Sequence, residues 1–335
     1  MSIVLSVCIP TYNRAEYLKY NVDKLLTLIK GLGPNQVEIC VSNNDSTDHT
    51  EALIKNYITD NPDIRIIYNK NETNLGPDWN YHHAMNMASG EYSILLGDDD
   101  YFADNALTRI FELINSDIEF DLLLFNKSLV SVDLKLIKKT SYLREDIGSQ
   151  VFDFSNPLVE KYYYTLCRTL GGVFSFISSL VYKTEAIRLI EFDESFIGCI
   201  YSFLGYTFPY LKGGRKLFFL NEYLINCRYG LPSFGSGYKR IFLDLKGYSF
   251  LKEKLFVNDD AGIEFINVLK YEWPLNHLLQ AYCYMDENEW KLTFRPLLLN
   301  IGWNEEDISF IEKIGSTPNL YQSKFKQKLK KLFFK

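Results

Sequence analysis

The chain has 335 residues, of which 47% are hydrophobic and 16% aromatic, so it can bury the core of one large domain or two smaller ones. Its formal net charge of -6 argues against a protein that binds nucleic acid over its whole surface. The six cysteines include no C-x-x-C pair, which argues against a zinc site or a disulfide framework and favours reduced thiols in the cytoplasm.

Strand and helix patterns alternate along the first part of the chain. Residues 1–10 lack the basic start of a signal peptide and are expected to enter a first strand. Helical spacing of apolar residues follows the first and fourth strand patterns. A loop rich in helix-capping residues follows the second, and a turn at 74–77 precedes the helix after the third. The strands are expected at residues 4–9, 37–41, 64–68, 92–96 and 122–125. This order specifies a mostly parallel sheet with helices on both faces.

The alternation ends near residue 127. Residues 174–182 and 216–226 have strand patterns, and residues 258–315 have helical ones. The loops at 11–14, 43–48 and 98–100 should open on one edge of the sheet, where open α/β folds bind ligands. No G-x-G-x-x-G follows the first strand and no G-x-x-x-x-G-K-[ST] occurs, which argues against a dinucleotide-binding Rossmann unit and a P-loop.

Three adjacent carboxylates, Asp98, Asp99 and Asp100, follow Gly97 at the end of the fourth strand. Like charges this close raise one another's pKa values, and a cation relieves the repulsion. Mg²⁺ and Mn²⁺ accept one or two carboxylates and keep positions for substrate phosphates. The triplet therefore predicts a metal site in a solvent-facing loop. The alternative is a solvated turn in which Asp104 caps the next helix.

Several motifs carry a resemblance to a known family. They are Val7-Cys-Ile-Pro-Thr-Tyr-Asn-Arg14, Val41-Ser-Asn-Asn-Asp-Ser-Thr-Asp48, Asn74-Leu-Gly76 followed by Ala88-Ser-Gly-Glu-Tyr92, and Leu96-Gly-Asp-Asp-Asp100. In this order, within about 100 residues, they resemble the family 2 glycosyltransferases, which have the GT-A fold. The last motif, with Asn-Leu-Gly-Pro-Asp before it, is most similar to bacterial enzymes that extend surface polysaccharides, such as abequosyltransferases. The resemblance is good over the first 125 residues or so and weak beyond them.

The resemblance implies a binding site for a nucleotide-sugar donor. Tyr12 would stack on the base, with Pro10, Thr11 and Arg14 beside it, and Asp98 would lie near the ribose. The alternative for Tyr12 is a half-buried loop aromatic.

The second loop departs from the family pattern. The family usually offers an acid there that reads the base, whereas this chain has Asn43 and Asn44 followed by Asp45. An amide both donates and accepts hydrogen bonds, so it suits uracil or cytosine. The alternative is helix capping by Ser46 and Asp48, which would leave Asn44 free.

The resemblance also implies a metal and a general base. It places Asp99 on Mn²⁺ or Mg²⁺, with Asp100 as a further ligand or an orienter, and the metal would stabilise the departing nucleoside diphosphate. A carboxylate from the second half would deprotonate the acceptor hydroxyl. Cys199 stands in the expected acidic position, so the nearest acids, Glu194 and then Asp193, are the candidates. The alternative to a catalytic role is that both acids simply lie in an exposed loop.

These inferences define an expected organisation. A GT-A domain spans residues 1–230, with a nucleotide-sugar part at 1–126 and an acceptor part at 127–230. A helical region spans 231–320. Arg228, Lys239 and Arg240 flank a Gly-rich loop and either close over a diphosphate or are solvated.

The expected function is inverting, metal-dependent transfer of a sugar to a carbohydrate acceptor, a lipid-linked glycan of bacterial O-antigen or capsule synthesis. The alternative is a non-catalytic sugar-binding or scaffold protein. The expected location is the cytoplasm, with no nucleic-acid partner. Residues 321–335 have an apolar helical face among lysines, which fits either an anionic membrane surface or packing on the protein itself.

Overall fold

The computed structural model describes residues 2–33, 35–230, 237–257 and 259–316. Its contacts divide the chain into two units, Met1–Leu231 and Pro232–Lys335. The first unit is a mixed α/β sheet with helices, and the second is helical. The expected fold class, a GT-A-like sheet with a helical C-terminal region, is therefore confirmed.

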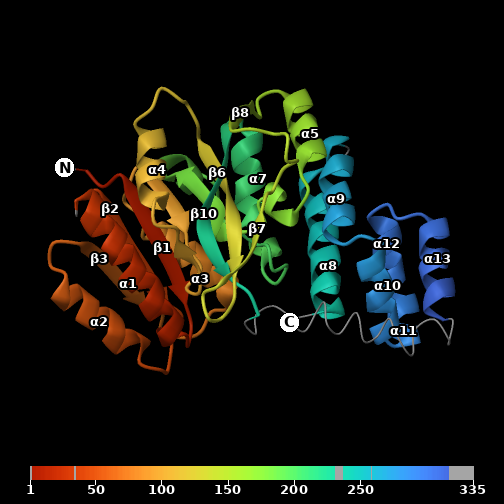
Figure 1. Cartoon of the computed structure of the whole chain (residues 1–335), viewed down its shortest axis with the longest axis horizontal. Coiled ribbons are helices and arrows are strands. Elements are labelled where there is room, and N and C mark those ends of the chain that lie inside the picture. Colours follow the sequence, from red (N-terminus) through yellow and green to blue (C-terminus); the bar gives the residue numbers. More distant parts are fainter. Residues whose placement is uncertain (1, 34, 231–236, 258, 317–335) are drawn as a thin grey trace. The chain divides into compact units, whose positions relative to one another are not determined.

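Four parallel strands form one half of the sheet, in the spatial order β3-β2-β1-β4. They are β1 (Leu5–Thr11), β2 (Val37–Asn43), β3 (Arg65–Lys70) and β4 (Tyr92–Leu95). The helices α1 (Ala15–Leu32), α2 (Thr50–Asp60) and α3 (Pro77–Asn86) connect them. Figure 1 shows α1 and α2 beside these strands. The order reverses at β1, because the chain runs from β1 outward to β3 and then returns to β4.

Successive side chains of the central strands point to opposite faces of the sheet, which explains why helices cover this half of it. Leu5, Val7 and Ile9 of β1 share one core with the apolar face of α1 and with α4 (Ala106–Ile114). On β2, Ser42 donates a hydrogen bond to Asn80 of α3 at 2.7 Å. All seven residues of each of these two strands are buried, which is typical of parallel strands packed between helices.

The other half of the sheet is mixed. β9 (Leu180–Lys183) pairs antiparallel with both β4 and β6 (Leu122–Val130), and β6 pairs parallel with the long β10 (Lys216–Arg228). The remaining strands are β5 (Tyr101–Phe102), β7 (Leu136–Thr140) and β8 (Gln150–Asp153), and the helices are α5 (Pro157–Leu166), α6 (Thr184–Arg188) and α7 (Leu204–Lys212).

The strand expected at 174–182 begins only at Leu180. Short 3₁₀ turns occupy Leu170–Val173 and Ile177–Ser179 instead, and Phe174 has a left-handed φ of 67°. A residue with positive φ cannot continue a strand, so the apolar run folds into a turn here. The strand expected at 216–226 is present as β10 and extends to Arg228.

The second unit consists of helices from residue 238 onward. They are α8 (Tyr238–Leu255), α9 (Ala261–Glu272), α10 (Leu275–Tyr284), α11 (Glu287–Glu289), a π-helical turn (Trp290–Phe294), α12 (Arg295–Asn300) and α13 (Glu305–Gly315). Trp290 and Phe294 are buried and stack at 5.2 Å within it. Among the described residues, none of the helices combines the length and apolarity needed to cross a membrane.

Candidate active site

Three loops meet at the carboxyl ends of β2, β1 and β4, which are neighbours in the sheet. Backbone hydrogen bonds tie the strand ends together: Asn44 donates to Thr11 at 2.9 Å, and Leu96 donates to Cys8 at 2.8 Å. The loops after these strands therefore open on one edge, as parallel topology requires.

Asp98 lies between the first loop and α1. Its Oδ2 accepts a hydrogen bond from the Thr11 hydroxyl at 2.8 Å, and its Oδ1 accepts one from Arg14 at 3.1 Å. The residue is 6% exposed. Burial raises the pKa of Asp98 to about 6, and the charge of Arg14 opposes that rise. Both carboxylate oxygens are thus held by the protein, and Thr11 and Arg14 contact the acidic triplet itself.

Arg14 also bonds the middle carboxylate. Its Nη1 lies 2.8 Å from Oδ2 of Asp99, so one guanidinium pairs with two adjacent acids. The side chain of Asp99 is 19% exposed, against 8% for Asp98. Within the described part of the chain, Oδ1 of Asp99 accepts no hydrogen bond. A side-chain cation therefore offsets part of the repulsion expected from the triplet, and one oxygen of Asp99 remains for a ligand.

Asp100 turns away from solvent. Its Oδ2 accepts a hydrogen bond from the Ser178 hydroxyl at 2.5 Å, and Ser178 accepts one from the Gly97 amide at 2.9 Å. A Cβ at the position of Gly97 would lie 2.9 Å from Oδ2 of Asp100, so a larger residue there would displace this carboxylate. Burial, followed by the charge of Asp99, raises the pKa of Asp100 to about 7.

The expectation of a solvent-facing acidic loop was therefore wrong. Asp98 and Asp100 are 6% and 4% exposed, and only Asp99 has substantial access to solvent. The reason is that Thr11 and Arg14 of the first loop, and Ser178 of a distant turn, supply hydrogen bonds that pull two of the carboxylates inward. Such burial fits a positioning role for Asp100 better than direct ligation.

The second loop is held by its own amides. Asn44 is 2% exposed, and its side chain bonds Asn71, Asn74, Leu75 and Gly76. The expectation that capping leaves Asn44 free was wrong, because its amide group organises the turn before α3.

The side-chain amide of Asn43 is also hydrogen-bonded within the protein. It is fully buried, donates to the Tyr68 hydroxyl at 2.8 Å and accepts from the Ser46 amide at 2.8 Å. Asp48 accepts hydrogen bonds from the amides of Ala15 and Thr50, so it caps two helices at once.

Tyr12 projects from the first loop and is 43% exposed, whereas Pro10 behind it is buried in β1. Asn13 follows with a left-handed φ of 52°, and its Oδ1 accepts a hydrogen bond from the Thr47 amide at 2.7 Å. This bond links the first and second loops and fixes the backbone beneath Tyr12. An exposed ring on an anchored loop is available for stacking on a planar ligand.

The candidate bases lie apart from the triplet in sequence and are exposed. Asp193 accepts a hydrogen bond from the Ser195 amide at 2.8 Å and caps the 3₁₀ turn Glu194–Phe196. The preceding Phe192 stacks on His82 of α3, with ring centroids 4.7 Å apart. Asp193 and Glu194 thus lie in an exposed loop, as the alternative interpretation expected. A carboxylate in such a loop is accessible to solvent and to a ligand.

A residue that the sequence did not single out holds the neighbouring turn. Asp78, near the start of α3, accepts hydrogen bonds from the Gly198 amide at 2.7 Å and from the Ser202 hydroxyl at 2.6 Å. Cys199, in the expected acidic position, is half-buried, and burial raises its pKa to about 11. The available signal was an acid directly after Gly76-Pro77, but only the fold shows its partners more than 100 residues away.

The donor atoms at this edge suit a hard cation. Among the described residues, no three His, Cys, Asp or Glu side chains cluster as a metal site. Mg²⁺ and Mn²⁺ do not need such a cluster, since one or two carboxylates plus substrate phosphates satisfy them. Asp99, with one oxygen unused by the protein, fits that arrangement.

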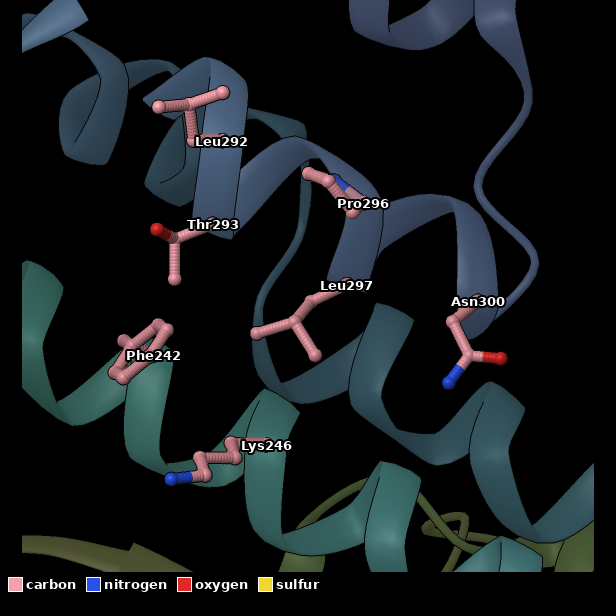
Figure 2. Close-up of a pocket in the computed structure, with 7 residues that line it drawn as sticks. All are labelled: Phe242, Lys246, Leu292, Thr293, Pro296, Leu297 and Asn300. Atoms are coloured by element: carbon pink, nitrogen blue, oxygen red, sulfur yellow. The ribbon is translucent and has the colours of Figure 1, made fainter. Parts of the chain in front are cut away.

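A hollow of about 410 Å³ lies within the second unit (Figure 2). Phe242 and Lys246 of α8 line one side, and residues from the π-helical turn and α12 line the other. Its lining offers no carboxylate, histidine or cysteine. Arg240, also on α8, pairs with Asp244 at 2.9 Å.

The chain is similar to proteins of known class. The model of glycosyl transferase family 2 matches residues 6–141. The chain is 33% identical to the abequosyltransferase RfbV of Salmonella typhimurium, over 93% of this chain and 94% of that protein. It is 27% identical to the GalNAc(5)-diNAcBac-PP-undecaprenol beta-1,3-glucosyltransferase of Campylobacter jejuni, over 58% and 56% of the two chains.

Solved structures with the same fold include TarS residues 1–349 of S. aureus in complex with UDP. The TM-score is 0.62 at 15% identity, covering 89% of this chain and 80% of that one. A mannosyltransferase of Pyrobaculum calidifontis, in complex with GDP-Man and Mn²⁺, has a TM-score of 0.52 at 14% identity, covering 96% and 88%. At these identities the likeness concerns the fold.

The raised pKa of Asp100 leads to a pH-dependent prediction. An unfolded aspartate titrates near pH 4, so ionising Asp100 costs stability as the pH rises from about 4 to about 7, and the cost is constant above that range. Asp100→Asn removes the charge and keeps an oxygen for Ser178. We expect it to melt above the wild type at about pH 8, by an advantage that shrinks towards pH 5.

Thermal unfolding in EDTA at several pH values measures this effect. Asp104→Asn is the matched control, because the side chain of Asp104 is 89% exposed and pairs with Lys24 at the surface. A melting-temperature difference for Asp100→Asn that stays constant across the pH range would contradict the assignment.

Proposed function

The chain belongs to glycosyltransferase family 2, and from this premise we propose that it transfers a sugar, with inversion, from a nucleotide-sugar to a lipid-linked glycan of bacterial surface-polysaccharide synthesis. The observation that carries the proposal is the arrangement of Asp98 and Asp99 around Arg14 at the carboxyl edge of the sheet. The alternative of a non-catalytic scaffold is not retained, because the matching family model and the curated relatives are those of glycosyltransferases.

The donor would lie along the ends of β1 and β4. Tyr12 is exposed enough to stack on the base. Asp98, which Thr11 and Arg14 hold in place, would lie near the ribose. Asn43 and Asn44 would contribute through the shape of the loop, since their amides are engaged within the protein. Pro10 would contribute as the rigid end of the buried β1 strand.

Asp99 would hold the metal through the oxygen that the protein leaves unused. Mn²⁺ or Mg²⁺ in that position supplies Lewis-acid stabilisation of the charge on the leaving nucleoside diphosphate. Asp100, fixed by Ser178, would keep the acidic turn in the geometry that presents Asp99.

The acceptor hydroxyl would lose its proton to a carboxylate on the exposed segment after Phe192. Glu194 is the favoured base, because Asp193 uses one oxygen to cap the turn. Asp78 would fix the turn that follows, through Gly198 and Ser202, and so define the acceptor side.

The first test of this function is Asp99→Asn. The variant should fold normally, because the side chain is partly exposed, but should lose transfer, because a neutral amide binds the cation far less well. Release of nucleoside diphosphate from UDP-, CDP-, GDP- and dTDP-sugars, with Mn²⁺ present, measures activity. Asp104→Asn is the surface control. Wild-type activity in Asp99→Asn under saturating Mn²⁺ would show that Asp99 is not the ligand.

The second test separates the two candidate bases. Glu194→Gln should lower the turnover rate by a factor of about 10² or more if this carboxylate takes the proton. Glu191→Gln, an exposed acid three residues earlier, should have no effect. Unchanged turnover in Glu194→Gln would exclude Glu194 and direct the same experiment to Asp193→Asn.

The third test concerns location. We propose a cytoplasmic enzyme that docks on the inner face of the cell membrane through residues 321–335, a segment that lies outside the described residues. Its lysines would contribute about 1 kcal/mol each near an anionic surface. The full chain should pellet with anionic vesicles at low salt more than at high salt, and a chain ending at Thr317 should not. Equal pelleting of both would refute membrane docking by this segment.

A further inference from the structure

The hairpin that joins β6 and β7 carries apolar side chains in solvent. Val132, Leu136 and Ile137 are 53%, 60% and 54% exposed. Figure 1 shows β6 and β7 as neighbours in the first unit, where they pair antiparallel. Tyr229 is 54% exposed and donates a backbone hydrogen bond to Val130 at the end of β6, so it lies beside them. Exposed apolar residues that gather in this way indicate an interaction site. The hairpin patch consists of Val132, Leu136, Ile137 and Tyr229.

Three lysines lie on the same hairpin. Lys135 is in the turn, Lys138 and Lys139 follow the apolar pair on β7, and all three are exposed. Residues 131–140 hold these three lysines against one acid, Asp133, so their formal charge is +2, whereas the whole chain has -6. Among the described residues, no carboxylate forms an ion pair with any of the three. The positive charge of the hairpin is therefore available to a partner.

The turn of the hairpin holds a leucine in a conformation that disfavours it. Leu134 has a left-handed φ of 62°, which glycine and asparagine adopt far more readily. Two backbone hydrogen bonds fix the turn: the amide of Ser131 donates to Lys135 at 2.8 Å, and the amide of Leu134 donates to Ser131 at 2.9 Å. Strain of this kind indicates that the side chain serves a purpose other than stability. Leu134 adds one more apolar side chain, half-buried, to the tip.

Sheet topology places the hairpin at the edge that carries the acidic triplet. β9 pairs antiparallel with both β4 and β6, so these two strands run parallel and end at the same edge. Asn226 of β10 pairs with Ser128 of β6 on one side and with Tyr101, directly after Asp100, on the other. β6 therefore lies two strand spacings, about 10 Å, from the segment after the triplet. Whatever the hairpin patch binds is held close to the candidate active site.

Exposed apolar side chains next to lysines fit an anionic lipid surface. The apolar tip can enter the boundary between headgroups and acyl chains, while the lysines behind it meet the lipid phosphates. Among the described strands β7 pairs with β6 alone, so a strand of another chain is the other conceivable partner. It fits less well, because Lys138 and Lys139 lie on β7, and charged side chains on an edge strand oppose such pairing.

We propose that the hairpin patch docks on an anionic lipid surface and turns the carboxyl edge of the sheet towards it. A lipid-linked acceptor presents its glycan at such a surface, so docking brings the acceptor to the edge where the donor binds. The purpose of docking rests on the proposed function, whereas the surface itself follows from the exposed apolar side chains and the lysines. A patch of this size binds weakly alone, and so it acts as a second contact beside residues 321–335.

Co-sedimentation of the full chain with vesicles tests the surface. Vesicles of phosphatidylcholine with phosphatidylglycerol are anionic, and vesicles of phosphatidylcholine alone are neutral. The double variant Leu136→Thr, Ile137→Thr keeps strand-forming side chains but removes apolar ones, and it should lower the partition coefficient about 10-fold or more. Lys135→Gln and Lys138→Gln should each lower it about fivefold on anionic vesicles, with a smaller effect at high salt.

Val151→Thr is the matched control for the apolar variant. Val151 is 40% exposed and lies on β8, which pairs with the start of β10 at the opposite edge of the sheet. Lys30→Gln is the control for charge, because Lys30 is exposed in the last turn of α1, which ends at that opposite edge. Both controls should bind vesicles as the wild type does. Every variant retains residues 321–335, so the contribution of that segment is the same in each.

Leu134→Asn separates docking from stability. Asparagine adopts a positive φ more readily than leucine, so this variant should melt at or above the temperature of the wild type. It should nevertheless bind anionic vesicles less, because the tip loses an apolar side chain. A purely structural role of the turn predicts no such loss. If the double variant melts early, Leu134→Asn decides instead.

Wild-type partition in the double variant, or an equal loss in Val151→Thr, would overturn the proposal. A dimer in light scattering that the double variant abolishes, with no binding of the wild type to vesicles, would also overturn it, because the patch would then join two copies of the chain. Turnover of nucleotide-sugar with a water-soluble acceptor is measured in parallel. Hairpin-dependent vesicle binding without turnover would refute the proposed function and leave the surface, and turnover without hairpin-dependent binding would refute the surface alone.

Discussion

The ion pairs between Arg14 and the two acids Asp98 and Asp99 are the constraint on which the site depends. Three carboxylates in sequence, two of them buried, would otherwise have to stay protonated or move into solvent, because an uncompensated buried charge is expensive. The guanidinium of Arg14 opposes that penalty at Asp98, and it does so from the loop after another strand. The acidic turn and the first loop are therefore held in one geometry.

The loops around this pair are built from amides and hydroxyls. Asn13 bonds the second loop, Asn44 bonds the turn before α3, and Asp48 caps two helices. Each is a polar group whose bonding capacity is used inside the protein, which makes the edge rigid before any ligand arrives. A pre-organised edge loses little conformational entropy when a ligand binds. The hydrogen bonds of these polar side chains within the loops therefore favour binding.

The segment that carries the candidate bases Asp193 and Glu194 is tied to α3. Asp78 at its start holds Gly198 and Ser202, and Phe192 stacks on His82 one turn further along. The candidate bases thus sit on a segment anchored on both sides but exposed in the middle. This combination allows a carboxylate to remain reachable while its backbone is fixed.

The sequence by itself determined the alternating strands and helices, the edge where the loops meet, and the family, because these depend on local periodicity and on short motifs. It also indicated the acidic triplet. Only the tertiary structure decided which acid faces out, since Thr11, Arg14 and Ser178 come from distant segments. The tertiary structure also decided the contacts of Asn44, because its hydrogen-bond partner Asn71 lies after the next strand. It likewise decided the place of Arg228, because the pairing of β10 with β5 brings that end of β10 to the triplet. Contacts between residues far apart in the chain leave no local pattern, so they had to be read from the fold.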